Sequence, residues 1–270
     1  MKVAFFDIDG TLIHVPSGIM TPTKPVRHAL EEFRKQGNQI IIASARGDLP
    51  EAMQDMEFDG YICSDGHYIR YRGEVLADDL FEEYQVQRMM DVFEKYHGRP
   101  EFYGHHDCWC SCLDDEYVIQ HRVHFQGTDA RPEGVHEEYQ ASDVHAISCC
   151  VMFANVEDLM NAYHELEGDF RMVVYDTGII RMDIYNLGHS KGTACEYLYK
   201  KLGVDFEDTY AFGDGVNDQE MLQLVKHGIA MGNAEESIKQ IAYEVTNTVQ
   251  NDGIAKYFEK EFGIVYDKKN

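Results

Sequence analysis

Four short apolar runs in this chain are each followed directly by a polar residue. The runs are VAFF, IIIA, YIC and TYAFG, and the residues that follow them are Asp7, Ser44, Ser64 and Asp214. Segments with helical spacing lie between runs, for example residues 21–37 and 191–203. Apolar strands that alternate with helices are typical of a parallel sheet covered on both faces. The sequence therefore predicts an α/β fold.

The strand–helix rhythm changes near residue 78 and returns after about residue 188. Between these points the pattern predicts helices at 83–98 and 157–168, and strands within 145–156, 170–176 and 178–186. Such a mixture indicates an α+β module with an antiparallel sheet. We therefore predict a core domain formed by residues 1–80 and 186–270, and an inserted α+β domain formed by residues 81–185.

The charge and the cysteines limit the possible partners and location. The chain has 24 Lys and Arg against 48 Asp and Glu, for a formal net charge of −24. Nucleic acids need a basic surface, so a nucleic-acid partner is excluded, and an anionic membrane is disfavoured. No signal peptide and no apolar run of roughly 20 residues is visible. The seven cysteines lack the arrangement of a disulfide framework, so we expect reduced thiols and a cytoplasmic protein.

Several acidic residues are expected to meet at one edge of the predicted sheet. The carboxyl ends of parallel strands share an edge, and ligands bind there. Asp7, Ser44 and Asp214 would therefore lie together, and Asp9 would join them because alternate side chains of an extended segment share a face. Carboxylates near an apolar core repel one another unless a cation is present. Hard oxygen ligands of this kind suit Mg²⁺.

These residues belong to motifs that resemble the haloacid dehalogenase (HAD) superfamily of phosphohydrolases. The motifs are DIDGT near the start, a hydroxyl at a strand end (Ser44), a lysine in HSKGTA (Lys191) and GDGVND late in the chain. The resemblance implies a Rossmann-like parallel-sheet core. The insertion between the second and third motifs resembles the type IIB cap of the Cof-like branch in size and alternation. The motif resemblance covers roughly residues 1–80 and 186–270.

The resemblance implies a role for each acidic residue. Asp7 would be the nucleophile that forms an aspartyl-phosphate, which divides one difficult displacement into two steps. Asp9 would protonate the leaving alkoxide and then take a proton from the attacking water. Asp214 would bind Mg²⁺ together with the Asp7 carboxylate and the Asp9 backbone carbonyl. Asp218 would either bind the metal directly or hold a metal-bound water, and the sequence leaves this open.

Polar residues of the other motifs are expected to bind the phosphoryl group. The resemblance implies this for Ser44, Lys191 and Asn217, with Lys191 also neutralising the nucleophile. Arg46 could pair with the substrate or with a core carboxylate, and the sequence does not decide between them. Asp65 stands where the family often has Asn, so the usual role of that position is in doubt.

The segment GHHDCWCSCLDD carries five residues with the chemistry of zinc ligands: His105, His106, Cys108, Cys110 and Cys112. The Cys-x-Cys-x-Cys spacing differs from that of a zinc knuckle and alternates along a strand. We therefore favour small apolar thiols on one face of a strand in the inserted domain over a metal site.

These inferences predict a Mg²⁺-dependent phosphatase that hydrolyses a small phosphorylated metabolite, with a sugar phosphate favoured. One alternative is a phosphomutase, which shares the aspartyl-phosphate but returns the phosphate to the sugar. Another is a non-catalytic protein that binds a phosphorylated metabolite, which the intact acidic residues disfavour. We expect a monomer or a weak homodimer. The identity of the metabolite and the residues of the inserted domain that select it cannot be read from the sequence.

Overall fold

The computed structural model describes residues 1–105 and 107–266. The chain divides into two compact units. The core unit consists of Met1–Ala77 and His189–Asn270, and the inserted unit consists of Asp78–Gly188. The junctions predicted from the sequence, at 80/81 and 185/186, lie a few residues inside the inserted unit. The two units are described separately below.

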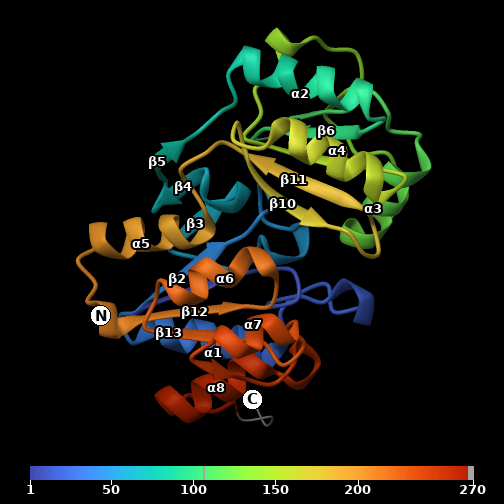
Figure 1. The fold of residues 1–270 in the computed structure, drawn as a ribbon. Helices are drawn as coiled ribbons and strands as arrows, with labels where there is room; N and C mark the ends of the chain where they lie inside the picture. Colours follow the sequence, from blue (N-terminus) through green and yellow to red (C-terminus); the bar gives the residue numbers. More distant parts are fainter. Residues whose placement is uncertain (106, 267–270) are drawn as a thin grey trace. The chain divides into compact units, whose positions relative to one another are not determined.

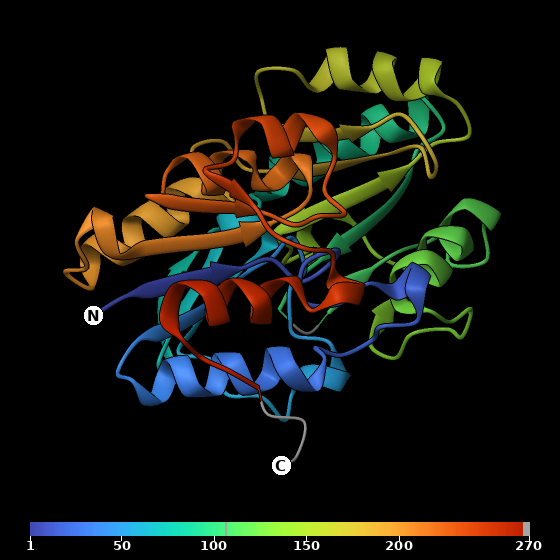
Figure 2. The ribbon, with the colours of Figure 1, turned by 90° about the horizontal axis from the view of Figure 1, so that it is seen from below.

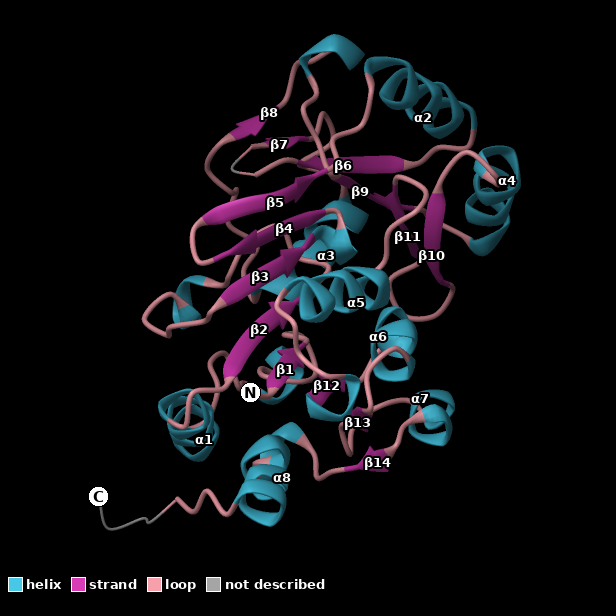
Figure 3. Cartoon of the chain, turned by 90° about the vertical axis from the view of Figure 1, so that its left-hand side faces the viewer, coloured by secondary structure: helices cyan, strands magenta, loops and turns pink. Residues whose placement is uncertain are grey.

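The core unit is built on an eight-stranded sheet with the order β14-β13-β12-β1-β2-β3-β4-β5 (Figure 3). Its strands are β1 (Val3–Phe6), β2 (Gln39–Ala43), β3 (Gly60–Cys63), β4 (Tyr68–Tyr71), β5 (Glu74–Asp78), β12 (Thr209–Gly213), β13 (His227–Ala230) and β14 (Glu244–Val245). The pairs from β14 to β3 are all parallel, which confirms the predicted sheet. The prediction missed β4, which pairs with β3 in the antiparallel sense.

Helices cover both faces of the core sheet (Figures 1 and 3). They are α1 (Lys24–Lys35), α5 (Lys191–Lys201), α6 (Gln219–Gln223), α7 (Glu236–Ile241) and α8 (Gly253–Phe262). Phe6 of β1 packs in the cluster that includes residues of α1 and α8, which lie side by side in Figure 2. Its neighbour Phe5 points to the opposite face, into the cluster with α5 and α6. Burial on both faces explains why these strands are apolar throughout rather than alternating.

Some local predictions need correction. The helix predicted for residues 21–37 is α1, which is shorter and spans Lys24–Lys35. The preceding Thr23 makes no side-chain cap and instead donates its hydroxyl to Asp252 Oδ1 at 2.6 Å. Between β2 and β3 the chain forms a single 3-10 turn, Glu51–Met53, rather than a helix of the length found elsewhere in the core unit. The prediction did not include β14, α7 and α8 at the end of the chain.

The inserted unit has a six-stranded sheet with the order β10-β11-β9-β6-β7-β8. Its elements are α2 (Glu83–Lys95), β6 (Arg99–Tyr103), β7 (Cys108–Trp109), α3 (Glu116–Gln126), β8 (Val135–His136), β9 (Ser148–Met152), α4 (Val156–Leu166), β10 (Arg171–Tyr175) and β11 (Arg181–Tyr185). Neighbouring strands of this sheet are antiparallel except β7 with β8, as expected for an α+β module. Buried residues of α2 and α4, such as Met89 and Leu159, form one cluster with Val151 of β9.

The helices of both units are short. The longest within the described residues is α2, with 13 residues. None of the helices in this part of the chain is long and apolar enough to cross a lipid bilayer.

Candidate active site

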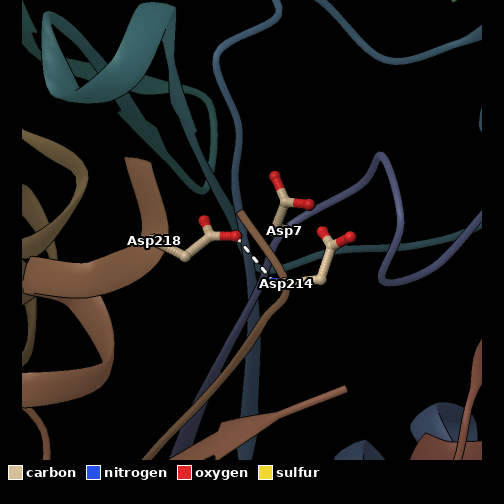
Figure 4. A group of neighbouring side chains, drawn as sticks. All are labelled: Asp7, Asp214 and Asp218. Carbon is tan, nitrogen blue, oxygen red and sulfur yellow. Dashed lines mark hydrogen bonds between the residues drawn. The ribbon is translucent and has the colours of Figure 1, made fainter. Parts of the chain in front are cut away.

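Three carboxylates meet at the carboxyl edge of the core sheet. Asp7 follows β1, and Asp214 follows the neighbouring strand β12. Asp218 ends the short turn Val216–Asp218, which comes after Asp214 in the sequence. One oxygen of each lies within 4.8 Å of the others (Figure 4). Asp7 and Asp218 are buried and Asp214 is half-buried. Asp7 and Asp214 therefore lie near one another, as their positions after parallel strands predicted.

Lys191 joins two of these carboxylates. Its side chain is fully buried, and its Nζ donates to Asp7 Oδ1 and to Asp218 Oδ1, both at 2.7 Å. It is the first residue of α5, whose amino end is capped by the Ser190 side chain, which accepts from Thr193 N at 3.1 Å. This cap fixes the helix start and so directs the lysine toward the acidic group.

Asp218 uses both of its carboxylate oxygens within the protein. Oδ2 accepts from the backbone N–H of Asp214 at 2.9 Å, the bond drawn in Figure 4. Oδ2 also accepts from the backbone N–H of Gly215 at 3.0 Å, and Oδ1 accepts from Lys191. The carboxylate therefore closes the loop that carries Asp214 and orients the lysine at the same time.

Gly10 and Asn233 hold the loop after β1 against Asp214. Gly10 has a φ of +87°, and a Cβ atom there would overlap the Asp214 carboxylate, so a larger residue would not fit. Asn233 Nδ2 donates to the Gly10 carbonyl at 2.7 Å and to Asp214 Oδ2 at 3.3 Å. Asn233 was not predicted as a site residue, although it lies only three residues after the end of β13.

Burial and mutual repulsion dominate the electrostatics of the site. Burial, reinforced by the charge of Asp218, raises the pKa of Asp7 well above its ordinary value. The same two causes raise the pKa of Asp214 to about 7. Burial lowers the pKa of Lys191, but Asp218 and Asp7 outweigh it and hold that pKa well above its ordinary value. The lysine is therefore cationic, and its single charge balances only part of the acidic group.

This donor set fits a hard divalent cation. Three carboxylates within reach of one another, with one ammonium beside them, leave excess negative charge at a buried point. Oxygen donors of this kind are the ligands that Mg²⁺ prefers. The residues present are thus compatible with the magnesium ion that the motifs imply.

Asp9 forms an ion pair with Arg46. Of the two partners considered for Arg46, substrate or a core carboxylate, the structure shows the carboxylate. Arg46 Nε donates to Asp9 Oδ2 at 2.6 Å, and Arg46 Nη2 donates to Asp9 Oδ1 at 2.8 Å. The two parallel bonds fix the plane of the carboxylate as a single bond could not. Ser44 lies in the same loop and is buried, and its Oγ accepts from Arg46 N at 3.1 Å.

Asn217 is held by a buried acid. Its Nδ2 donates to Asp65 Oδ1 at 3.2 Å. Asp65 is fully buried, has a φ of +54°, and donates its backbone N–H to the Ser44 carbonyl at 3.0 Å. A left-handed conformation is uncommon for a residue other than Gly, and Asp and Asn adopt it more readily than most. Asp65 thereby connects the loop after β3 to the residue expected to bind phosphate.

The predicted His and Cys segment lies in the inserted unit, and its strand is shorter than expected. The strand β7 contains only Cys108 and Trp109, while Cys112 lies in a turn that precedes α3. Cys110 is buried against Leu113 and neighbouring apolar residues, as a packing role predicts. His105 Nε2 contacts Asp78 Oδ2 at 3.0 Å, and His106 lies outside the described residues.

Comparisons of sequence identify relatives over the whole length of the chain. A family model for haloacid dehalogenase-like hydrolases matches residues 4–258. The putative phosphatase YkrA of Bacillus subtilis is 28% identical over 266 residues, which cover 98% of both chains. The 5-amino-6-(5-phospho-D-ribitylamino)uracil phosphatase YitU of the same organism is 26% identical over 272 residues, which cover 96% of both.

Comparison of structure agrees with these relatives. The HAD subclass IIB sugar phosphatase BT4131 superposes with a TM-score of 0.83 at 26% identity, covering 98% of this chain and all of that one. A family model matches nearly the whole chain, and phosphatases are found among both the relatives and the structural neighbours, so the family of this protein is established. It belongs to the haloacid dehalogenase-like hydrolases and is a phosphatase of that family.

Proposed function

We propose that this protein is a Mg²⁺-dependent phosphomonoesterase that hydrolyses a small phosphorylated metabolite through an aspartyl-phosphate. The observation that carries this proposal is the contact of the buried Lys191 with Asp7, beside Asp214 and Asp218. Phosphoryl transfer depends mainly on positioning and charge stabilisation. This edge of the sheet supplies both, through the Asp7 carboxylate, the buried Lys191 cation and the acidic pair Asp214 and Asp218.

Asp7 is the nucleophile in this proposal. Lys191 holds Asp7 Oδ1 at 2.7 Å, which fixes the side chain and leaves Oδ2 to attack phosphorus. The ammonium also offsets the repulsion between the attacking carboxylate and the anionic phosphoryl group. The Ser44 Oγ already accepts from Arg46 N, so its own O–H is left to donate to a phosphoryl oxygen.

Asp9 is the proton donor and acceptor. Arg46 fixes the plane of its carboxylate, so one residue can serve both steps: the proton that Asp9 gives to the leaving group is recovered from the attacking water. In the same way Asp65 holds Asn217, which would present its remaining amide hydrogen to the phosphoryl group.

Asp7, Asp214 and the Asp9 carbonyl would hold Mg²⁺, which when bound neutralises charge on the phosphoryl oxygens. For Asp218 we propose a positioning role. Its two oxygens are already engaged by Lys191 and by the backbone N–H groups of Asp214 and Gly215, so its removal would release both the lysine and the loop.

A sugar phosphate or sugar-alcohol phosphate is the substrate class we favour. The names of two similar proteins, YitU and BT4131, refer to a phosphorylated ribityl compound and to sugar phosphates. The test is release of inorganic phosphate from a panel of phosphorylated sugars, sugar alcohols and nucleotides in the presence of Mg²⁺. No turnover of any member, nor of an aryl phosphate, would contradict a catalytic role and favour a binding protein.

A phosphomutase would use the same Asp7 intermediate, so the proposed hydrolysis is tested against it. Analysis of products separates the two: a hydrolase yields free phosphate and sugar, whereas a mutase yields an isomeric sugar phosphate. We also propose a cytoplasmic location, which fits the seven free cysteines because thiols stay reduced there.

We predict that Mg²⁺ supports turnover and that Ca²⁺ does not. Ca²⁺ accepts more oxygen ligands at longer distances and would engage the second Asp7 oxygen, which must stay free to attack. Both ions should raise the melting temperature, because either relieves the repulsion among the three carboxylates. The measurements are phosphate release and thermal unfolding with each ion. The Asp214→Asn variant should weaken both thermal shifts, and full activity in excess chelator would rule out the metal.

We predict that Arg46→Gln lowers kcat for a sugar phosphate by roughly 10- to 100-fold, because a misplaced Asp9 transfers protons poorly. Arg46→Lys keeps the charge but cannot form both bonds, so it should restore little of the rate. An activated aryl phosphate, which needs no proton on departure, should be much less affected in its first step. If Arg46 bound substrate instead, KM would rise for both substrates while kcat stayed constant.

A further inference from the structure

We propose that Cys110 and Cys112 form a dithiol site that hydrogen peroxide, or another small hydroperoxide, oxidises to a disulfide. The two residues, here called the thiol pair, belong to the DCWCSCL segment, which the phosphatase site does not use. Both lie in the inserted unit, within the described residues.

The sulfur atoms of the thiol pair are already in contact. Cys110 Sγ and Cys112 Sγ lie 3.7 Å apart. A disulfide requires about 2.05 Å, so the sulfurs must approach by roughly 1.7 Å, which side-chain rotation and a small shift of the turn can supply. Cys112 lies in the turn at residues 111–114, which begins directly after Cys110.

The backbone around the pair is anchored on both sides, which keeps the sulfurs together. Cys110 N donates to the His136 carbonyl at 3.0 Å, and Asp115 N donates to the Cys112 carbonyl at 3.0 Å. Arg122 Nη2 donates to the carbonyl of Leu113 at 2.9 Å. Cys110 itself is fully buried in the cluster with Leu113 and Met152, whereas Cys112 is half-buried and can meet a small solute.

Cys112 differs electrostatically from the other cysteines, all seven of which lie in the described part of the chain. The hydrogen bond from Cys110 lowers the pKa of Cys112. The same contact, together with burial, raises the pKa of Cys110. Burial raises the pKa of each of the other five thiols, for example that of Cys63 to about 12. The thiolate is the form of cysteine that reacts with peroxide, so we expect Cys112 to be the residue that is oxidised first.

The reaction balances in two steps. The Cys112 thiolate attacks one peroxide oxygen, the O–O bond breaks, and Cys112 sulfenic acid and hydroxide form. Cys110 sulfur then attacks the Cys112 sulfur, the S–O bond breaks, and water leaves with the Cys110 proton. The pair loses two electrons and two protons, and one peroxide is reduced to two molecules of water.

The experiment is treatment of the folded full-length protein with dilute hydrogen peroxide, followed by alkylation, digestion and mass spectrometry. We expect a peptide whose mass is lower by two hydrogens, with Cys110 and Cys112 both protected from alkylation and both recovered after reduction. In Cys112→Ser the crosslink should be lost completely. In Cys110→Ser, Cys112 has no partner and should gain oxygen atoms as sulfinic acid.

Cys108→Ser is the matched control. Cys108 is also two residues from Cys110 and is half-buried, but burial raises its pKa. Its loss should leave the rate of crosslinking unchanged within twofold. Alkylation of both thiols after peroxide treatment of the wild type, or loss of the crosslink in Cys108→Ser, would overturn the proposal. Crosslinking with the same preference in denaturant would show that the fold does not create the site, and would also overturn it.

Discussion

Asp7→Asn is expected to abolish turnover, with a fall in kcat of roughly 10⁴- to 10⁶-fold, because an amide cannot replace the attacking carboxylate. The fold should survive, since Asn is nearly isosteric and its carbonyl can still accept from Lys191. The substitution also removes a carboxylate whose pKa is raised by burial and by the charge of Asp218. Without metal, the melting temperature should therefore be equal to that of the wild type or higher.

The measurements are phosphate release from the best substrate of the panel and thermal unfolding in chelator. Asp7→Ala is the comparison for stability, because it leaves Lys191 with one acceptor fewer and opens space beside a buried charge. It should melt at a lower temperature than Asp7→Asn. Retention of wild-type activity by a pure preparation of Asp7→Asn would overturn the assignment of the nucleophile.

Asp9→Asn is expected to separate substrates by their leaving groups. General acid catalysis contributes about 10²- to 10⁴-fold, so formation of the aspartyl-phosphate should slow by that factor for a sugar phosphate. An activated phenolate leaves without a proton, so the same step should proceed nearly normally. The second step needs Asp9 to activate water, so the variant should stop at the aspartyl-phosphate.

The deciding observation is a rapid release of phenolate, equal in amount to the enzyme, followed by slow turnover. Arg46→Gln provides a control, because it disturbs the same carboxylate without removing it. It should show the same preference for good leaving groups but continue to turn over. Equal loss on both substrates with no initial release would mean that Asp9 maintains the site rather than transfers protons.

The sheet and the position of its acidic residues could be predicted because they follow from local pattern and topology. Apolar runs identify buried parallel strands, and the residues that follow such strands lie at the same edge of the sheet. The proximity of Asp7 and Asp214 could therefore be predicted from the sequence alone. The same reasoning could have found Asn233 after β13. It was missed because Asn233 lies outside the four motifs.

Side-chain pairing could not be predicted in the same way. Nothing in the spacing of Asp9 and Arg46 distinguishes a pair with each other from a contact with substrate, because the pairing depends on where two loops meet. Likewise α3 has no apolar stripe to mark it as a helix, since its apolar residues are spread around the helix rather than gathered on one face. In β3 and β4, the antiparallel return depends on the left-handed residues Ser64 and Asp65.

The strand order also constrains the sequence of events during synthesis. The central strand β1 pairs on one side with β2, which soon follows it, but on the other side with β12, whose residues 209–213 are made much later. The inserted unit is continuous in sequence and can complete its own sheets and helices as it emerges from the ribosome. Until β12 is made, the backbone N–H and C=O groups on one edge of β1 have no partner strand, and they can pair with a strand of another chain. A nascent chain arrested before residue 209 should therefore depend on chaperones far more than one released a few residues after β12.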